Sequence, residues 1–379
     1  MGQTSTRRKR LDPTQTGRDA LQLEKGLQKL IVGQDESIEQ IVNVYQTYLA
    51  GMTSPGRPIG NFLFLGPTGT GKTRVVEATA ETLLGDPRGV IKIDCAEFQH
   101  SHEIAKLIGS PPGYLGHRET HPLLSQETLN QYHTDKLKVS FVLFDEIEKA
   151  SDALWNLLLG ILDKASLTLG DNRRVDFSKA MIFMTSNLGA TEMETLMNPG
   201  FGFARRPQVS ANGSLGDRIK SAGVNAARRK FTPEFMNRID KVVVFKPLGQ
   251  EQLRRILQLE LSRVQERIFA GTPFLFQLSD AAREFLLTEG TDEKYGARHL
   301  KRAIERSLVY PMANLIATKQ VRAGDLVAVD LDASAERMTF DRIDEGLPVY
   351  TMFRAAGVEA PEEENARAAS IDSLKLRTA

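Results

Sequence analysis

Hydrophobic and polar residues follow two different patterns in the first 250 residues of the chain. Apolar residues recur at helical spacing from Ala20 to Ile31–Gln34 and again from Asp35 to about Ala50. Short apolar strands then alternate with helical segments, and the predicted strands are Asn61–Leu65, Val90–Ile93, Phe141–Phe144, Met181–Thr185 and Val242–Phe245. Such alternation is typical of a mostly parallel sheet covered by helices on both faces. The pattern therefore predicts an α/β nucleotide-binding architecture.

The pattern changes after Pro247, which closes the fifth apolar run. Helical spacing predicts three helices and a closing β-hairpin, namely Gln250–Ile268, Asp280–Leu287, Ala297–Ile316 with a bend near Pro311, and strands at Leu326–Leu331 and Arg337–Ile343. We therefore predict a basic, disordered tail over residues 1–19 and an α/β domain over 20–246. A small, mostly helical domain over 247–345 and a flexible tail over 346–379 complete the prediction.

Composition narrows the class of protein. The chain has 379 residues, a formal net charge of +1 and no apolar run long enough for a membrane span. Near-neutral charge gives no reason to expect nucleic acid or a membrane surface as partner. The single cysteine, Cys95, favours a reducing compartment, and we expect a cytoplasmic protein. Gly2 and Thr6 fit a myristoylation pattern, although a solvated basic tail is the favoured interpretation.

A phosphate-binding loop follows the first predicted strand. It reads Gly66, Pro67, Thr68, Gly69, Thr70, Gly71, Lys72 and Thr73, which fits G-x-x-x-x-G-K-[ST] in full. Glycines let backbone N–H groups close around phosphate oxygens, and the following helix adds positive partial charge. Lys72 is expected to reach the β- and γ-phosphates, and the Thr73 hydroxyl is expected to bind Mg²⁺. The predicted cofactors are ATP and Mg²⁺.

An acidic pair ends the third predicted strand. We expect Asp145 to hold the Mg²⁺ shell and Glu146 to act as general base toward the attacking water. The alternative is that the two carboxylates cap a helix, because Asp favours N-cap positions. A phosphate loop in the same chain favours the catalytic interpretation.

Longer strings carry a resemblance to a known family. They are Ile31–Gln34, Arg57–Gly69, Leu107–Gly116, Leu143–Lys149, Met184–Gly189, Phe231–Asp240 and Tyr295–Arg298. In these strings the chain resembles the Clp unfoldase group of AAA+ ATPases, most closely the second ATPase ring of the disaggregase ClpB. The resemblance implies an AAA+ P-loop domain with a five-stranded parallel sheet, followed by a small, mostly helical C-terminal domain.

The resemblance also implies roles for four further residues. Val32 would pack against the adenine base, although Ile31–Gln34 could be a plain turn between helices. Asn187 would orient the water or touch the γ-phosphate, or simply form a turn. Arg238 would be an arginine finger that enters a neighbouring subunit's site, or would pair with Asp240 or Glu234 in its own chain. Arg298 would contact the phosphates of its own chain, or lie solvated on the surface.

Two loops bear on what the ATPase acts on. By the resemblance, Tyr114 and Leu115 would line the pore of a ring and grip polypeptide, while the alternative is that they pack inward. Phe201, Gly202 and Phe203 resemble a loop that docks a ClpP-like peptidase, although the family form starts with Ile or Leu.

These features predict a homo-hexameric unfoldase that hydrolyses ATP and threads polypeptide through a central pore. One alternative is a regulatory subunit of a ClpP-like protease. Another is a dedicated remodeller of one partner complex, because the chain holds one ATPase module and unusual tails. A nucleic-acid remodeller is disfavoured by the Tyr114 loop and by the near-neutral charge.

Overall fold

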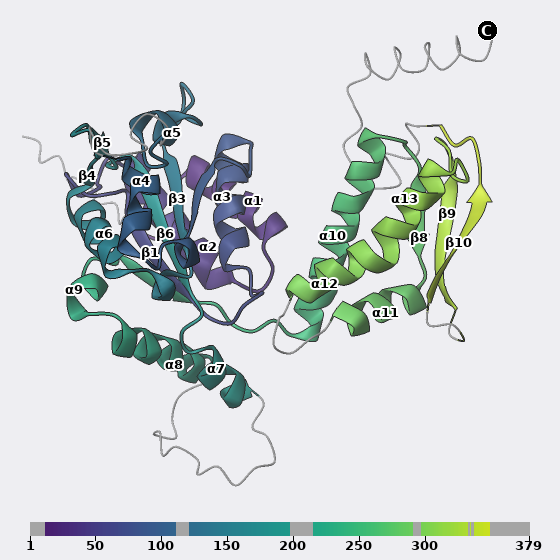
Figure 1. Ribbon diagram of the computed structural model, residues 1–379. Coiled ribbons are helices and arrows are strands. Elements are labelled where there is room, and N and C mark those ends of the chain that lie inside the picture. The colour runs from purple at the N-terminus through teal and green to yellow at the C-terminus, as the bar shows by residue number, and fades with distance from the viewer. Residues whose placement is uncertain are drawn as a thin grey trace, which may run out of the picture. The chain divides into compact units, whose positions relative to one another are not determined.

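The computed structural model describes residues 12–110, 121–197, 215–290, 297–332, 334 and 337–348. The chain divides into two compact units between Pro247 and Leu248. Each unit has its own hydrophobic core and is described by itself (Figure 1).

The first unit opens with two amphipathic helices. Helix α1 (Arg18–Leu30) buries Ala20, Leu23 and Leu27, and α2 (Asp35–Leu49) buries one face that includes Ile38 and Ile41. The predicted basic tail therefore extends too far, because Arg18 and Asp19 already belong to α1. The sequence pattern missed them because the first turn of this helix is polar and exposed.

Five strands form one sheet, as predicted. They are β1 (Gly60–Leu65), β2 (Val90–Asp94), β3 (Ser140–Asp145), β6 (Ala180–Ser186) and β7 (Lys241–Val244). Their order is β2-β3-β6-β1-β7, and every neighbouring pair is parallel. Parallel pairing places the carboxyl ends of β3, β6 and β1 side by side at one edge of the sheet.

Alternate strand residues enter two separate cores. Phe62, Phe64 and Phe183 face the core built with α1, α2 and α3 (Lys72–Leu84), where the rings of Phe62 and Phe183 stack 4.8 Å apart. Leu63 and Leu65 face the other core, which includes Leu158 of α6 (Asp152–Lys164). Helices thus cover both faces of the sheet (Figure 1), and this explains why its central strands are apolar throughout.

The remaining elements of the first unit are short, except for the 16-residue helix α8 (Leu215–Lys230). The short helical ones are η1 (Cys95–Glu97), η2 (Ser101–Ile104), α4 (Ala105–Ile108), α5 (Gln126–Asn130), η3 (Ile147–Lys149), α7 (Ala190–Met197) and α9 (Pro233–Met236). The strands β4 (Ser166–Thr168) and β5 (Arg174–Asp176) form a small antiparallel hairpin that the sequence pattern did not reveal. Three-residue strands are too short to show a period of two.

The second unit combines helices with a three-stranded sheet. Helices α10 (Gln250–Ala270), α11 (Asp280–Gly290), α12 (Ala297–Ile304) and α13 (Tyr310–Ala317) agree with the predicted segments. A π-helical segment, η4 (Glu305–Val309), joins α12 to α13, whose second residue is Pro311. Proline cannot donate a backbone hydrogen bond, so an irregular turn at this place is expected.

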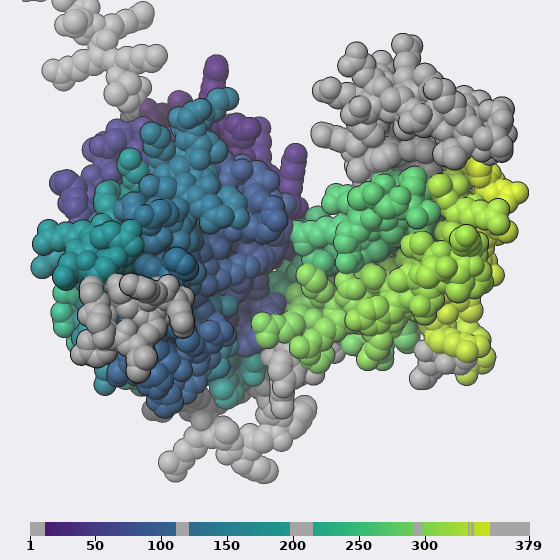
Figure 2. All heavy atoms as spheres, turned by 45° about the horizontal axis from the view of Figure 1, so that its top comes forward, coloured from purple at the N-terminus to yellow at the C-terminus, as the bar shows by residue number. Residues whose placement is uncertain are grey.

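The closing hairpin is also confirmed, with one addition. Strands β9 (Leu326–Asp332) and β10 (Arg337–Asp344) pair antiparallel. The four-residue strand β8 (Leu275–Leu278) joins β9 in parallel, so the sheet order is β10-β9-β8. The predicted two-stranded hairpin was therefore incomplete. Side chains of β10 are exposed or half-buried and form part of the surface of this unit (Figure 2, yellow).

Candidate nucleotide site

The phosphate loop connects β1 to the first residue of α3. Gly66 has a φ of +143°, and a Cβ at this position would lie 2.5 Å from the carbonyl oxygen of Phe245. Gly71 has a φ of +98° and caps α3, with no atom within 4 Å of the place of a Cβ. These glycines allow the tight turn and leave room beside the N-terminus of α3.

Lys72 turns its side chain back into this loop. Its Nζ donates to the carbonyl oxygens of Gly66 at 2.7 Å and Pro67 at 2.8 Å. It also donates to Asn187 Oδ1 at 2.9 Å, and Lys72 is only 8% exposed. The lysine therefore connects the phosphate loop on β1 to the residue that follows β6.

The acidic strand end lies next to the same loop. Thr73 Oγ1 donates to Asp145 Oδ2 at 3.3 Å. The Thr185 hydroxyl donates to Asp145 Oδ1 and accepts from the backbone N–H of Glu146 at 3.0 Å. Thr185 was not among the predicted site residues, since a threonine near the end of a buried strand carries no signal of its own. Because β6 pairs with β3, Thr185 of β6 lies beside the end of β3 and contacts both Asp145 and Glu146.

Glu146 and Asn187 face each other across β3 and β6. Asn187 Nδ2 donates to Glu146 Oε1 at 3.2 Å, and Lys149 forms an ion pair with Glu146 Oε2. The hydrogen bond from Lys149 lowers the pKa of the Glu146 carboxyl below its ordinary value, whereas burial acts in the opposite direction. The carboxylate is therefore held in its ionised form, which a general base requires.

The backbone at Glu146 is unusual. Its φ of 55° and ψ of 50° lie in the left-handed region, which non-glycine residues seldom adopt. Glu148 accepts from the backbone N–H of Asn187 at 3.1 Å, and its other carboxylate oxygen is buried without a hydrogen-bond partner. Glu148 and Lys149 thus support the site, although no role was predicted for either residue.

Gln34 contributes to the phosphate loop through its side chain. Its Nε2 donates to the carbonyl oxygens of Thr70 at 3.1 Å and Lys246 at 2.9 Å, and its Oε1 accepts from Lys246 N at 3.2 Å. Gln34 is buried, as is Val32. The prediction for Ile31–Gln34 concerned only Val32 and the adenine base, so this contact of Gln34 with the phosphate loop was not expected.

The residues present suit a nucleotide with a divalent cation. The Thr73 hydroxyl and the Asp145 carboxylate offer hard oxygen ligands at one place, as Mg²⁺ requires. The open space beside Gly71, at the N-terminus of α3, matches the needs of a phosphate group.

The two predicted arginines differ in their surroundings. Arg238 pairs with Glu234 at 2.9 Å and donates to the carbonyl oxygen of Leu159 at 2.9 Å, while Asp240 pairs instead with Arg57 at 3.4 Å. The intrachain pair with Glu234 is therefore present in the single chain. Arg298 is exposed in the first turn of α12, within the second unit.

Two predicted loops lie outside the described residues. They contain the pore residues Tyr114 and Leu115 and the candidate peptidase-docking residues Phe201, Gly202 and Phe203. Their roles stay predictions.

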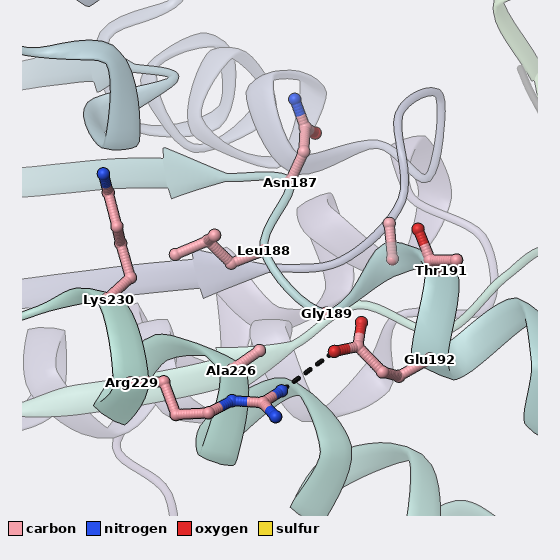
Figure 3. A pocket seen from close by; sticks show the side chains of 9 residues that line it. Asn187, Leu188, Gly189, Thr191, Glu192, Ala226, Arg229 and Lys230 are labelled. Carbon is pink, nitrogen blue, oxygen red and sulfur yellow. Dashed lines mark hydrogen bonds and ion pairs between the residues drawn. The ribbon is translucent and has the colours of Figure 1, made fainter.

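An open pocket of about 430 Å³ adjoins Asn187. Figure 3 shows the Asn187 side chain pointing away from an ion pair between Arg229 of α8 and Glu192 of α7, which is 2.8 Å long. Leu188 and Ala226 contribute apolar surface to the same pocket. The pocket thus lies behind the loop that carries Asn187, and the sequence pattern gave no sign of it.

Comparison with known proteins identifies both units. Residues 57–242 match the AAA domain (Cdc48 subfamily), and residues 248–329 match the C-terminal, D2-small domain of ClpB protein. No helix in the described ranges has the length and apolarity to cross a bilayer.

Full-length relatives agree with these matches. The chain is 37% identical over 312 residues to chaperone protein ClpB of Rhodopirellula baltica, covering 82% of this chain and 33% of that protein. It is 37% identical over 339 residues to chloroplastic ClpB3 of Arabidopsis thaliana, covering 87% and 33%. The chain therefore spans about a third of the length of the curated relatives it matches.

A solved structure supports the same assignment. Hsp104, solved in a closed state with ATPγS and FITC casein, has a TM-score of 0.69 and 28% identity, covering 86% of this chain and 52% of that one. The curated relatives are described as chaperones, which does not favour the alternative of a peptidase subunit. By both of its modules, the chain belongs to the AAA+ ATPases of the ClpB type.

Proposed function

We propose that this chain hydrolyses ATP with Mg²⁺ and uses the reaction to unfold or remodel other polypeptides. One observation carries the proposal. Lys72, Thr73–Asp145 and Glu146–Asn187 are joined by hydrogen bonds at the carboxyl ends of three adjacent strands. This arrangement occurs in a chain whose two modules are of the ClpB type.

Binding and catalysis divide between the two sides of this site. Lys72 and the backbone of Gly66–Gly71 would hold the phosphates, and Thr73 and Asp145 would hold the metal. Bound Mg²⁺ would supply positive charge to the phosphate oxygens. Glu146 would accept a proton from the attacking water, while Asn187 keeps that carboxylate in place through its 3.2 Å hydrogen bond.

Arg238 would complete the site of a neighbouring copy. Its guanidinium would leave the Glu234 carboxylate and stabilise the negative charge that develops on the departing phosphate of the neighbouring copy's nucleotide. Arg298 would contact the phosphates of the ATP bound to its own chain, and Val32 would pack against the adenine base of that ATP. Hydrolysis would then depend on assembly of a ring, which we propose to be a homo-hexamer.

Tyr114 and Leu115 would grip the polypeptide in the pore of that ring. An aromatic side chain offers apolar area to any sequence, which suits a substrate of varied composition. We also propose a cytoplasmic location, because the only cysteine is buried and unpaired.

Substrate trapping tests this proposal. Tagged Glu146→Gln protein, held in ATP in its native cell extract, should retain ATP and co-purify with many unrelated polypeptides. The matched control is Glu146→Gln combined with Tyr114→Ala, which should lose them. One stoichiometric partner would indicate a dedicated remodeller, and a peptidase ring would revive the protease alternative. Normal ATP turnover by Glu146→Gln would refute the assignment of the general base, while Lys72→Ala should fail to bind nucleotide.

A further inference from the structure

The backbone carbonyl of Arg238 receives two side-chain donors, one from the segment before β1 and one from β1 itself. Arg57 Nη2 lies 3.2 Å and Asn61 Nδ2 lies 3.0 Å from the Arg238 carbonyl oxygen. Residues 237–240 lie between α9 and β7, outside regular structure. Side-chain donors therefore take the place of the partners that a helix or strand would supply to this carbonyl.

The contact extends to Asp240. Its Oδ2 accepts from the backbone N–H of Asn61 at 2.8 Å, and its own N–H donates to the Asn61 carbonyl at 2.9 Å. Arg57 Nη1 lies 3.4 Å from Asp240 Oδ1. Both residues that flank Ile239 are thus tied to Arg57 and Asn61. The parallel pairing of β1 with β7 then begins directly, with Phe62 opposite Lys241.

Asn61 is suited to a fixed role. It is fully buried, and its Nδ2 also donates to the carbonyl oxygen of Leu162 in the last turn of α6 at 3.2 Å. One amide therefore joins β1, α6 and the Arg238 segment. A buried amide has no water with which to replace these partners, so breaking its hydrogen bonds costs free energy. The backbone of Arg238 is therefore held firmly.

The guanidinium of Arg238 is held in a different way. Its partners are Glu234 at 2.9 Å, the Leu159 carbonyl at 2.9 Å and, at 3.9 Å, Asp163. The side chains of Glu234 and Asp163 are 63% and 47% exposed. Ion pairs with exposed carboxylates are weak, so a phosphate group can replace Glu234 and Asp163 as partners of the guanidinium. The hydrogen bonds to the Arg238 carbonyl are harder to break, because Asn61 is buried.

From this contrast we infer that Arg57 and Asn61 are positioning residues for Arg238. They hold its main chain in place while its guanidinium remains free to move from Glu234 to the phosphates of a neighbouring copy. Because Asn61 lies in β1, which leads directly to Gly66, the phosphate loop of one site and the backbone of the arginine that serves the next are both attached to this strand. The inference rests on the role proposed above for Arg238.

Kinetics of two variants provide the first test. Arg57→Gln and Asn61→Leu should lower kcat about tenfold to a hundredfold, the usual effect of a misplaced catalytic group, and should leave KM for ATP within about twofold. The control is Arg254→Gln, which removes an exposed arginine whose side chain pairs with Glu284 at 3.1 Å in the second unit, and which should keep wild-type turnover. Arg57 is one-third exposed, so its variant should fold even if the buried Asn61→Leu does not. A wild-type kcat for Arg57→Gln would overturn the inference.

Mixed assemblies separate positioning from local damage. Arg57→Gln protein has an intact site and a misplaced arginine, whereas Glu146→Gln has an inactive site and an intact arginine. When the two variants are mixed and reassembled, ATP turnover should exceed the mean of the two variants measured alone, because the intact site of an Arg57→Gln copy can receive the well-placed Arg238 of a Glu146→Gln copy. Arg238→Ala mixed with Glu146→Gln should behave in the same way.

The two mixtures also distinguish the possible failures. If Arg238→Ala gains turnover on mixing and Arg57→Gln does not, Arg57 does not act through Arg238, and the inference is overturned while the proposed function stands. If Arg238→Ala itself gains nothing, the transfer of Arg238 between copies is wrong, and the inference falls with it.

Discussion

Thr185 is the residue that joins the two acidic positions of the site. Its hydroxyl contacts Asp145 and the backbone N–H of Glu146, and the residue is 1% exposed. Glu146 needs such support because its backbone φ and ψ angles lie in the left-handed region, which is strained for a residue other than glycine. Strain of this kind persists only where neighbouring contacts hold the residue, and Thr185 supplies one of them.

A Thr185→Val variant tests this role, because valine has the same shape and no hydroxyl. Loss of the two hydrogen bonds should leave the N–H of Glu146 buried and unpaired, at a cost of about 1–3 kcal/mol. We expect ATP turnover to fall about tenfold to a hundredfold, with affinity for a non-hydrolysable ATP analogue almost unchanged. Thr195→Val removes an exposed hydroxyl that donates to Thr191 in α7, and should be silent. Equal turnover in both variants would contradict the role of Thr185.

Cys95 gives a prediction on pH. Burial, followed by the nearby Asp145 carboxylate, raises the pKa of the Cys95 thiol far above its ordinary value. The folded state therefore binds the thiol proton more tightly than the unfolded state, which titrates near 9.0. The stability that results is fully present below pH 9 and decreases as the pH rises above it. At pH 10 the loss should be about 1 kcal/mol.

Urea unfolding at pH 7.5 and pH 10 measures this effect. The wild type should lose about 1 kcal/mol more stability over this interval than Cys95→Ala, which has no thiol to ionise. Identical losses in the two proteins would mean that the thiol is not protected in the folded state.

At the scale of elements, the turn from β1 into α3 depends on one close approach. A side chain at Gly66 would meet the backbone carbonyl of Phe245, which follows β7, at 2.5 Å. Neither side can rotate away, because the Gly66 backbone and the Phe245 carbonyl directly follow the paired strands β1 and β7. The glycine therefore keeps β1 and β7 paired up to the first residue of the phosphate loop.

Gly66→Ala should destabilise the first unit by about 1–3 kcal/mol through backbone strain. It should also weaken nucleotide binding, because the Gly66 carbonyl accepts from Lys72. Trp155, the only tryptophan, packs against Phe231 and Phe235 in the first unit, so its fluorescence reports the thermal unfolding. Gly17→Ala, at a position with nothing within 4 Å, is the control and should shift the midpoint little. A wild-type midpoint for Gly66→Ala would show that the strands can separate without cost.

Element boundaries show which patterns could be recognised in the sequence. Helices α2 and α10, and the central strands of the sheet, follow the predicted ranges closely. Long periodic helices and continuous apolar strands leave a strong signal. Strands β4, β5 and β8 have three or four residues and were missed, since only pairing with a neighbour makes such segments into strands.

At the scale of the whole molecule, the two units have separate cores. Leu286 is fully buried in a cluster formed entirely by residues after Leu248, including Leu300 and Leu308. Separate cores imply that each unit can unfold by itself.

A Leu286→Ala variant of the full chain tests this independence. It should destabilise the second unit by about 2–5 kcal/mol through cavity formation. Far-UV circular dichroism should show an earlier partial transition, while Trp155 fluorescence should keep its wild-type midpoint. If the fluorescence midpoint moved by the same amount as the circular dichroism transition, the two units would unfold as one.

The α/β architecture, the phosphate loop and the acidic strand end could be predicted from the amino-acid sequence, because these depend on local periodicity and on short spacings along the chain. The support of the site became visible only in the folded chain. Thr185, Gln34 and the Arg57–Asn61 pair act through hydrogen bonds to residues 40, 36 and about 180 positions away. Contacts of this range arise from strand order and register, which local patterns do not specify.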